Sequence, residues 1–384
     1  MYPFLNEDQK DLLKLFKEFA ENEVAPISKE YDLSGEFPME TFKKAAEIGL
    51  TILRIPEEYG GLGQSSMTEM IMLEELSKAD AGFATAVGAC GLAATPVMLG
   101  GTAEQKQKIC DVLVNGGISA FCLTEAEAGS DAASLKTTAT RDGDEYIING
   151  VKTFITNGGI ADIYVVFATV DRSLGAKGIC AFIVEREREG VSVGKEENKM
   201  GIRLSNTTDV IFQNVRIPAA NMIGEIGQGL KLALGTLDMT RGTGAISAVG
   251  ICQKAIELAT EYAKERKTFG RPIISNQAIQ FKLADMEVKT QTARQMVYYH
   301  AQLIDKGIVD GEVSAIAKLY AGDVAVEVAL DAIQIFGGYG YSREFPVEKL
   351  LRDAKIFQIF EGTAEVQRMV IAGKVAKKNG RTWN

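Results

Sequence analysis

The spacing of apolar residues changes twice along this chain of 384 residues and divides it into three parts. Over residues 7–114 apolar side chains recur three or four positions apart, which is typical of amphipathic helices. Over residues 118–223 short β-rich runs replace that spacing. Over residues 229–374 the helical spacing returns. The pattern therefore predicts two helical units on either side of a β domain.

This order of elements predicts an α+β fold with three domains. We expect an N-terminal α-helical domain over residues 1–117, a middle β domain of barrel or sandwich type over residues 118–223, and a C-terminal four-helix bundle over residues 224–384. Long amphipathic helices are expected at residues 279–303 and 314–335, where no proline interrupts the pattern.

Shorter signals refine this division. Proline cannot donate a backbone hydrogen bond, so we expect prolines to separate the N-terminal helices. The turn sequence Asp142-Gly143-Asp144 predicts a chain reversal between strands. The prolines concerned are Pro3, Pro26, Pro38, Pro56 and Pro96, and the predicted strand segments are 146–148, 163–167, 179–184 and 210–212.

Charge and cysteine content exclude several classes of protein. The formal net charge is -9, and no concentrated basic stripe is present, which argues against binding to a nucleic-acid backbone. The five cysteines form no C-x-x-C pair and have no histidine beside them, which favours free thiols over disulfides or a metal site. The single histidine, His300, lies within a helical stretch, where we expect a structural role.

Targeting signals are not evident in the sequence. The first residues lack the basic and apolar regions of a leader peptide, and the last residues are not a peroxisomal address. We count no apolar segment of about 18 residues, so we expect no membrane span. These observations favour a cytoplasmic protein.

Glu361 is the residue for which the sequence most directly suggests a catalytic role. It follows Phe357, Ile359 and Phe360, and apolar surroundings raise the pKa of a carboxyl group towards neutrality, where it can act as a base. Gly362 lets the backbone pass close to a ligand. The alternative is that Glu361 is an exposed residue at a helix end, a common place for glutamate.

Four motifs that follow one another along the chain give this glutamate a context. The motifs are Phe121-Cys122-Leu123-Thr124-Glu125-Ala126-Glu127-Ala128-Gly129-Ser130-Asp131, Asn149-Gly150-Val151-Lys152-Thr153-Phe154-Ile155-Thr156-Asn157-Gly158-Gly159, Glu265-Arg266-Lys267-Thr268-Phe269-Gly270 and Gln334-Ile335-Phe336-Gly337-Gly338-Tyr339-Gly340. Each motif alone is common, but the ordered set is specific. Through this set the chain resembles the acyl-CoA dehydrogenase family over residues 8–376.

The resemblance implies FAD as the cofactor. The sequence lacks the Rossmann pattern of a strand, G-x-G-x-x-G and a helix, and the glycines at residues 224–229 are expected to form a loop and a helix start. A flavin would therefore lie between domains. By resemblance, the cofactor-binding residues are Phe121, Leu123, Thr124, Phe154, Thr156, Arg266, Thr268, Asn276, Gln277, Gln334, Gly337, Gly338, Thr363 and Glu365.

The same resemblance implies that each FAD site is built from residues of two neighbouring chains. The set around Arg266 would reach the FAD phosphates and adenine of a neighbouring subunit, and arginine suits phosphate because its fork satisfies two oxygens at once. A homo-oligomer, most often a tetramer in this family, is therefore implied. Without the resemblance, Gly337 and Gly338 would be interpreted as a helix stop, and the two threonines Thr124 and Thr156 as ordinary strand residues.

The resemblance also implies a mechanism. Glu361 would remove the α-proton of an acyl-CoA thioester while the β-hydrogen leaves as hydride to flavin N5, giving a trans-enoyl-CoA. The backbone N–H of Glu361 and a flavin ribityl hydroxyl would hold the thioester carbonyl. Electrons would pass to an electron-transferring flavoprotein. The substrate contacts implied are Ser130, Asp238, Arg241 and Gly362, although Asp238 and Arg241 are spaced so that they can simply pair on a helix.

Departures from the family pattern narrow the substrate. Thr240 is not a carboxylate, which disfavours the isovaleryl-type placement of the base, and Ala84 stands where enzymes for glutaryl-type substrates carry arginine. Residues 87–94 are small and apolar, so we expect a short, branched or cyclic acyl chain. Ala126 replaces a usual proline and is expected to loosen the turn that carries Thr124. Phe154 and Phe360 replace a frequent tryptophan and tyrosine.

Other functions are compatible with these residues. The same site can run in reverse, as an enoyl-CoA reductase supplied by a reduced flavoprotein, because sequence does not set the direction of flux. An acyl-CoA oxidase is disfavoured by the length of the chain, and a nucleic-acid-associated member by its acidic charge. A catalytically silent acyl-CoA-binding protein is disfavoured by the presence of Glu361. The sequence does not set the length of the acyl group, the direction of the reaction, the electron-transfer partner or the exact oligomeric state.

Overall fold

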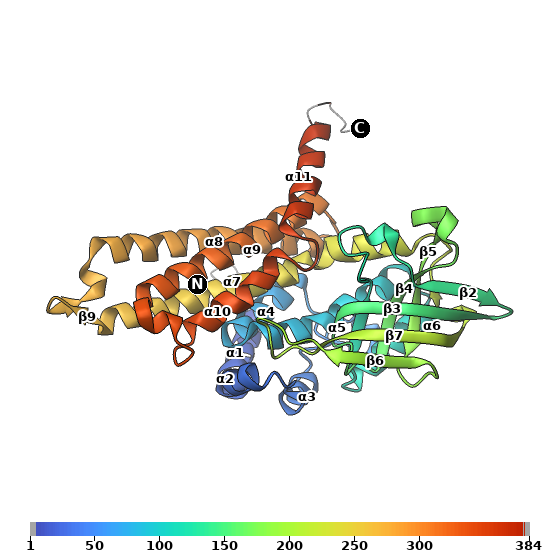
Figure 1. Ribbon diagram of the computed structural model, residues 1–384, viewed down its shortest axis with the longest axis horizontal. Coiled ribbons are helices and arrows are strands. Elements are labelled where there is room, and N and C mark those ends of the chain that lie inside the picture. The colour runs from blue at the N-terminus through green and yellow to red at the C-terminus, as the bar shows by residue number, and fades with distance from the viewer. Residues whose placement is uncertain (1–4, 379, 381–384) are drawn as a thin grey trace.

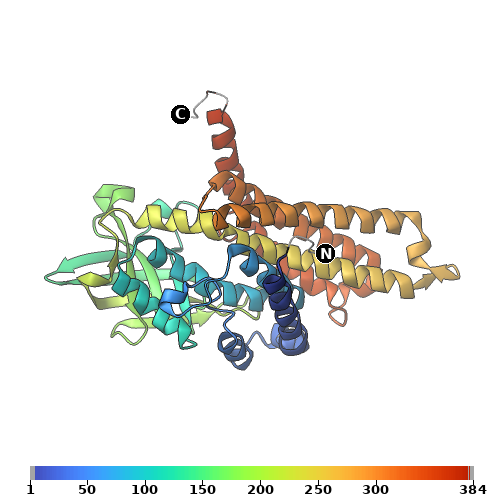
Figure 2. The ribbon, with the colours of Figure 1, turned by 180° about the vertical axis from the view of Figure 1, so that it is seen from behind.

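The computed structural model describes residues 5–378 and 380. It has a β-rich part at one end and a bundle of long helices at the other, with the N-terminal helices packed against both (Figure 1). Seen from behind, the N-terminal helices lie along one flank of helix α7 (Figure 2). This is the arrangement of helices, sheet and helices expected from the apolar pattern.

The N-terminal domain consists of short helices whose starts are capped by polar side chains. Asn6 and Thr102 each accept a hydrogen bond from the third helical residue in a capping box, and Asp80 accepts from two backbone amides. One π turn, Ala20–Val24, joins the first two helices. The helices are α1 (Glu7–Phe19), α2 (Ala25–Ser34), α3 (Met39–Glu47), α4 (Ser66–Ala79), α5 (Ala81–Gly100) and α6 (Ala103–Val114).

Prolines act as expected at three positions and differently at a fourth. Pro26 lies in the first turn of α2, Pro38 directly precedes α3, and Pro56 precedes the 3-10 turn Glu57–Tyr59. Pro96 does not separate helices, because it lies inside α5 near its C-terminal end. Pro96 is buried, and packing there can offset one lost hydrogen bond. Pro3 lies outside the described residues.

Helix α5 also corrects the expectation that the chain contains no long apolar segment. Residues Ala81–Gly100 are long and apolar enough to cross a membrane by length and composition. In the structure 61% of the most apolar window of this helix is buried inside the protein. Helix α5 packs against α4, α7 and strand β1, which gives its apolar residues partners within the fold.

The middle domain is one continuous hydrogen-bonded sheet that folds into two facing halves. The strand order is β6-β7-β3-β2-β4-β5-β8, with β1 beside β4, and a single residue pair joins β2 to β4. Aromatic contacts cross between the halves, with ring centroids 5.1 Å apart for Tyr146 and Phe182 and 6.4 Å apart for Tyr164 and Phe212. This packing is that of a sandwich, one of the two architectures expected for this domain.

The strands include every segment predicted from β-rich composition. Four more strands lie where the sequence gave no strong signal, because they are short or mainly polar. The strands are β1 (Ser119–Cys122), β2 (Thr138–Asp142), β3 (Glu145–Thr156), β4 (Ile163–Thr169), β5 (Ile179–Glu185), β6 (Val191–Glu196), β7 (Thr207–Pro218) and β8 (Met222–Ile223). The expected reversal at Asp142-Gly143-Asp144 joins β2 to β3, and Gly143 has a φ of 61°.

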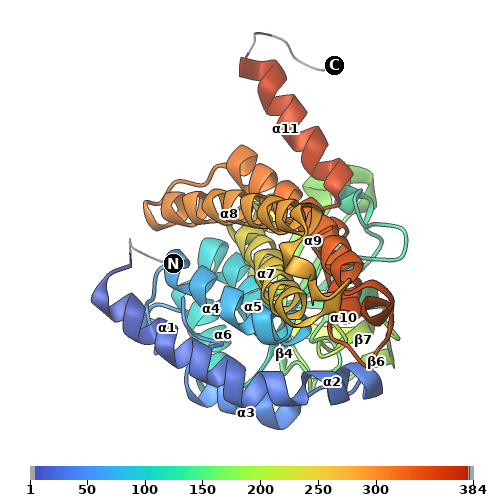
Figure 3. The same ribbon diagram turned by 90° about the vertical axis from the view of Figure 1, so that its left-hand side faces the viewer.

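The C-terminal domain is a bundle of long helices in which α9 contacts all the others. The bundle contains α7 (Gly229–Glu265), α8 (Gln277–Asp305), α9 (Gly311–Phe336) and α10 (Val347–Ala354), and α11 (Ala364–Lys378) extends away from it (Figures 1 and 3). A small hairpin of β9 (Lys267–Thr268) and β10 (Arg271–Pro272) closes the end of the bundle farthest from the sheet. The glycines at 224–229 form the loop that begins α7, as expected.

The cysteines and the histidine have structural surroundings. All five cysteines are buried and unpaired, in agreement with the expectation of free thiols. His300 is buried in the bundle, its Nε2 lies 3.2 Å from the carbonyl oxygen of Met239, and burial lowers its pKa. The described residues contain no cluster of acidic, histidine or cysteine side chains suited to a metal ion.

Candidate functional site

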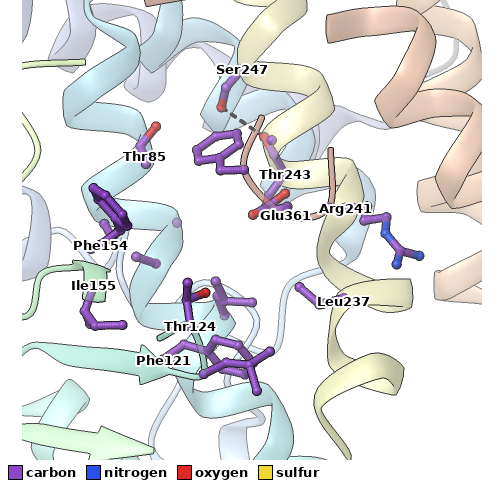
Figure 4. Close-up of a pocket in the computed structure, with 18 of the residues that line it drawn as sticks. Thr85, Phe121, Thr124, Phe154, Ile155, Leu237, Arg241, Thr243, Ser247 and Glu361 are labelled. Atoms are coloured by element: carbon purple, nitrogen blue, oxygen red, sulfur yellow. Dashed lines mark hydrogen bonds between the residues drawn. The ribbon is translucent and has the colours of Figure 1, made fainter. Parts of the chain in front are cut away.

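The main cavity lies where the three domains meet, and its volume is about 230 Å³. Helix α5 supplies one wall, β1 and β3 supply a second, and α7 supplies a third (Figure 4). The loop between α10 and α11 brings Phe360, Glu361 and Gly362 to the same space. Because each wall comes from a different domain, the fold itself assembles this cavity.

Glu361 places a carboxylate in this cavity. Its backbone has a φ of 55°, an uncommon conformation for a residue with a side chain, which is often found at functional sites. Oε2 of Glu361 is buried and has no hydrogen-bond partner among the described residues. Figure 4 shows the carboxylate beside Thr243 of α7, inside the cavity. A buried carboxylate oxygen without a partner is costly for the fold, so its presence points to a functional role.

Burial raises the pKa of Glu361 to about 7. The positive charges of Lys318 and Arg241 act in the opposite direction and keep the pKa lower than burial alone would. This agrees with the effect expected from the apolar residues that precede Glu361 in the sequence. A carboxyl group with this pKa can both accept and release a proton near neutral pH.

Two buried side chains fix the backbone of the loop that carries Glu361. Nζ of Lys318 on α9 donates a hydrogen bond of 2.7 Å to the carbonyl oxygen of Gly362. Nε2 of Gln367 on α11 donates to the carbonyl oxygens of Glu361 at 3.1 Å and of Gly362 at 3.0 Å. Lys318 is only 2% exposed, and burial lowers its pKa to about 8. The strained conformation of Glu361 is therefore held by its neighbours.

Gly244 provides the space that the carboxylate occupies. A Cβ built on Gly244 would lie 2.6 Å from Oε2 of Glu361, closer than Cβ atoms are found to other heavy atoms. The glycine lies within α7, where it costs about 1 kcal/mol of helix stability relative to alanine. The close approach of the carboxylate to α7 is the physical reason for a glycine at this position.

Several of the residues expected at the flavin line this same cavity. Phe121, Leu123 and Thr124 reach it from β1 and the residues that follow, and Phe154 and Thr156 from β3. Phe154 has a φ of 54° and is 64% exposed, so its ring lies at the open side of the cavity. Ser130 and Gly362, expected to contact substrate, also line the cavity. The structure thus brings these predicted residues together with Glu361.

The turn that carries Thr124 is well anchored, although Ala126 replaces proline there. The carboxylate of Glu125 accepts hydrogen bonds from the backbone amides of Lys136 at 2.6 Å and Thr137 at 3.0 Å. The ammonium group of Lys152, which is fully buried, donates to Glu125 Oε1 at 2.7 Å and to the carbonyl oxygen of Leu123 at 3.1 Å. The expectation of a looser turn is therefore not met, because the buried Lys152–Glu125 ion pair holds the turn without a proline.

The remaining cofactor residues lie at two other places in the chain. Thr363 and Glu365 begin α11, next to Glu361, and Thr363 Oγ1 accepts a hydrogen bond of 3.2 Å from the amide of Val366. The others gather at the end of the bundle near β9, far from the sheet (Figure 1). That group comprises Arg266, Thr268, Asn276, Gln277, Gln334, Gly337 and Gly338.

This second group is suited to an anionic ligand such as the pyrophosphate of FAD. Arg266, Thr268, Gly337 and Gly338 line one hollow, and Arg266 forms no ion pair with any acidic side chain in the described part of the chain. Cβ atoms built on Gly337 and Gly338 would meet nothing within 4 Å, so the backbone there is open to a ligand. The hollow lies at the end of the bundle near β9, whereas the main cavity lies where the three domains meet, so one chain does not unite them.

Asp238 and Arg241 are engaged with each other. Nη1 of Arg241 donates to Oδ1 of Asp238 and, at 3.2 Å, to the hydroxyl of Ser314. Figure 4 shows the guanidinium of Arg241 directed away from the cavity. Asp238 does not line the cavity. Asp238 and Arg241 therefore pair with each other on the helix, as their spacing allows. A contact of either residue with CoA stays a prediction.

Sequence reasoning missed several residues that shape the cavity. Gly244, Lys318 and Gln367 all act on the Glu361 loop from other helices. Thr85, Thr243 and Ser247 add hydroxyl groups to the cavity walls. No local motif marks any of these residues, because their proximity to Glu361 depends on how the helices pack.

Comparison with known protein families agrees with this architecture. The chain matches the models of the N-terminal domain of acyl-CoA dehydrogenase over residues 6–117, of its middle domain over residues 120–215 and of its C-terminal domain over residues 227–376.

Individual relatives cover nearly the whole chain. Butyryl-CoA dehydrogenase from Megasphaera elsdenii is 45% identical, with a TM-score of 0.95 over 98% of this chain and 100% of that one. A structure described as the electron transferring flavoprotein of Acidaminococcus fermentans, from work on flavin-based electron bifurcation, has a chain that is 44% identical, with a TM-score of 0.95 over 98% and 99%. The 3-(aryl)acrylate reductase of Clostridium sporogenes is 43% identical over 97% of this chain and 100% of its own length.

Proposed function

Because the chain belongs to the acyl-CoA dehydrogenase family, we propose that it converts an acyl-CoA thioester to the trans-enoyl-CoA with Glu361 as the base. The family consists of FAD-dependent oxidoreductases. The observation that carries the proposal is the buried carboxylate of Glu361, which has an unpaired oxygen and a pKa of about 7 inside the cavity.

The role of Glu361 is to remove the α-proton of the thioester. Its pKa near 7 means that a large fraction of the enzyme holds it ionised at neutral pH, while the proton it accepts is still bound firmly. Burial removes the water that would otherwise solvate the carboxylate and compete for it. When held by the cavity residues Phe121, Thr124 and Thr156, FAD would supply the acceptor for the hydride of the β-carbon, which gives the enoyl-CoA as the product.

The acidity of the α-proton depends on hydrogen bonds to the thioester carbonyl. The backbone N–H of Glu361 donates to no acceptor among residues 5–378, so it is free to meet that oxygen. Lys318 and Gln367 hold this amide in place through their hydrogen bonds to the neighbouring carbonyl groups. We infer that the same loop supplies both the base and a donor to the developing enolate, and such positioning contributes greatly to the rate.

The shape of the cavity supports a compact acyl group next to the base. Ala84, Gly88, Ala89 and Leu92 of α5 line it with small or aliphatic side chains. Ala84 offers no positive charge to a distal carboxylate, which supports the exclusion of glutaryl-type substrates. We infer that butyryl-CoA or another short, branched or cyclic acyl-CoA is accepted.

The partners and the assembly of the enzyme are also part of the proposal. The similar chain in the electron transferring flavoprotein work supports a flavoprotein as the electron partner. The separation of the Arg266 hollow from the main cavity supports an oligomer in which a neighbouring chain completes each FAD site. A tetramer and a cytoplasmic location are our predictions from the family resemblance and the sequence.

Anaerobic titration of the purified holoenzyme tests the proposed reaction. Saturated straight, branched and cyclic acyl-CoAs are added in turn, and the oxidised flavin absorbance is followed in the wild type and in Glu361→Gln. We expect butyryl-CoA to bleach the flavin of the wild type and the variant to retain its colour in the same experiment. If no acyl-CoA bleaches the wild type, the protein is an acyl-CoA-binding member without dehydrogenase activity.

The reverse reaction is the second candidate, and one observation favours it. The relative from Clostridium sporogenes, which is 43% identical, is named 3-(aryl)acrylate reductase, and a reductase of this name supports testing the reverse direction. Supplying reduced electron-transferring flavoprotein together with an enoyl-CoA tests for it. Faster turnover in this direction than in the forward direction, with the same flavoprotein, would assign the protein as a reductase that uses the same base as an acid.

A further inference from the structure

A second cavity adjoins the main one on the side away from the β domain. We call it the distal chamber; its volume is about 260 Å³, and it lies between α4, α5, α7 and residues 50–56. Gly88, Leu92 and Thr243 line both cavities, so they form the boundary between them. Thr243 stands beside Glu361 in Figure 4, so the distal chamber begins close to the base.

One of the three boundary residues, Gly88, has no side chain. A Cβ built on Gly88 would meet only the methyl groups of Leu73, at 3.5 and 3.7 Å, which are ordinary contacts. The fold therefore has room for a side chain at residue 88 and does not place one there. An acyl chain longer than that of butyryl-CoA would extend past Gly88 into the distal chamber.

The distal chamber contains an ion pair among apolar walls. Nη1 of Arg54 donates to Oε2 of Glu69 at 3.2 Å, and their side chains are 26% and 9% exposed. Leu53, Met72 and Val87 are among the apolar residues around the pair. Burial raises the pKa of Glu69, and Arg54 opposes that shift. Glu69 is buried and Arg54 is partly exposed, and burying a charge is costly unless its remaining hydrogen-bonding groups are satisfied.

Those remaining groups have no partner within the described part of the chain. The bond to Glu69 is the only hydrogen bond of the Arg54 guanidinium there, and the second oxygen of Glu69 accepts none. Thr51, a residue that is 4% exposed and also lines the distal chamber, has a buried Oγ1 without a partner. The free groups of Arg54 and Glu69 line the chamber, so water or a ligand inside it can satisfy them.

The charges of the pair indicate which ligand fits. A distal carboxylate would be attracted by the guanidinium of Arg54 but repelled by the carboxylate of Glu69, and a distal ammonium group would meet the reverse, so neither ion gains a clear advantage from the pair. A plain alkyl end would leave the polar groups unsatisfied. A neutral group that both donates and accepts hydrogen bonds can satisfy both partners, by donating to Glu69 and accepting from Arg54.

We propose that the distal chamber binds the far end of the acyl group and that Arg54 and Glu69 select acyl-CoAs ending in a neutral hydroxyl, phenol or carboxamide. This inference rests on the proposed function, because it assumes that the main cavity holds the thioester beside Glu361. It assigns a specificity role to two residues that lie outside the motifs of the sequence.

Matched pairs of substrates test the selection. The holoenzyme is assayed with ω-hydroxyhexanoyl-CoA against hexanoyl-CoA, and with para-hydroxyphenylpropanoyl-CoA against phenylpropanoyl-CoA, all normalised to butyryl-CoA. We expect kcat/KM to favour the hydroxylated member of at least one pair by about 10- to 100-fold, as is usual for a hydrogen bond to a buried charged group. In the double variant Arg54→Met/Glu69→Leu that ratio should fall to about one or reverse.

Two further variants separate this effect from damage to the fold. Arg216→Met/Glu145→Leu makes the same exchange in an exposed pair of the β domain, with side chains 53% and 43% exposed, and should keep the wild-type ratio. Gly88→Leu should close the boundary, so that the longer substrates lose activity relative to butyryl-CoA. Circular dichroism and flavin content establish that each variant is folded.

The outcomes distinguish this inference from the proposed function. Turnover of butyryl-CoA without preference for any hydroxylated substrate would overturn the inference and leave the function intact. A preference that survives in the Arg54→Met/Glu69→Leu variant would also overturn it. Loss of the preference in that variant alone would support it. If no acyl-CoA is turned over at all, the proposed function fails and the inference with it.

Discussion

A Cβ atom at residue 244 would lie 2.6 Å from Oε2 of Glu361, and the protein has glycine there. The carboxylate therefore approaches the backbone of α7 more closely than any other residue type would allow. The carboxylate can take this position because residue 244 of α7 has no Cβ atom. This relationship connects the packing of the bundle directly to the chemistry proposed for the cavity.

Gly244→Ala should reduce activity while the fold is kept. The added methyl group displaces the carboxylate, and misplacing a catalytic group by about 1 Å can cost about 10²-fold in rate. Steady-state kcat with butyryl-CoA measures the loss. Gly235→Ala is the matched control on the same helix, because its Cβ would meet only Leu99 Cδ1 at 3.9 Å. Wild-type turnover in Gly244→Ala would show that the carboxylate does not need this space.

The pH dependence of the reaction should report the pKa of Glu361. The base works only when ionised, so kcat/KM should rise with pH through about 7, the pKa that burial gives it. The charge of Lys318 lowers that pKa, so Lys318→Met should move the rise to higher pH. Lys318→Arg keeps the charge and serves as the control. An unchanged pH profile in Lys318→Met would show that Lys318 does not lower the pKa of Glu361.

Lys152→Met should destabilise the β domain. Removing the ammonium group leaves the carboxylate of Glu125 buried without its ionic partner, a change that typically costs about 3–5 kcal/mol. Chemical denaturation of the holoenzyme measures it. Lys136→Met, which removes an exposed partner of Glu127 in the same turn, should cost less than about 1 kcal/mol. Equal losses in the two variants would contradict the anchoring role given to Lys152.

Mixed oligomers should recover activity if neighbouring chains complete each FAD site. Glu361→Gln and Arg266→Ala are each expected to be inactive, because the first removes the base in the main cavity and the second removes a cofactor contact in the Arg266 hollow. In a mixed oligomer, one site can combine the intact Glu361 of one chain with the intact Arg266 of the other. Co-expression with two affinity tags and assay of the mixed species tests this. Glu361→Gln mixed with Gly244→Ala, which both affect the base, is the control that should not exceed the reduced activity of Gly244→Ala alone.

The fold was largely predictable because apolar periodicity reports secondary structure over long segments. The helices expected at 279–303 and 314–335 correspond to α8 and α9, and the β-rich runs all fall within strands. The effect of Pro96 was not predictable, since local chemistry argued for a break and burial in the core outweighed it. The apolar length of α5 is visible in the sequence and was underestimated there, and the structure shows that its partners α4, α7 and β1 come from all three domains.

The candidate site was predictable only where its residues are marked by motifs. Glu361 and the threonines Thr124 and Thr156 could be named from the sequence, and the structure brings them to one cavity. Gly244, Lys318 and the Arg54–Glu69 pair could not, because they act across distances in the sequence that no local pattern spans. Their roles follow from three-dimensional contacts alone.

The role of Glu361 is tested most directly by rapid mixing of the oxidised holoenzyme with butyryl-CoA, unlabelled or deuterated at the α-carbon, in the wild type and in Glu361→Gln. The account predicts that flavin reduction in the wild type slows with the deuterated substrate. It also predicts that Glu361→Gln, with its flavin still bound, reduces at least about 10³-fold more slowly, because the group that accepts the proton is gone. Flavin reduction at the wild-type rate in Glu361→Gln would contradict the assignment of Glu361 as the base.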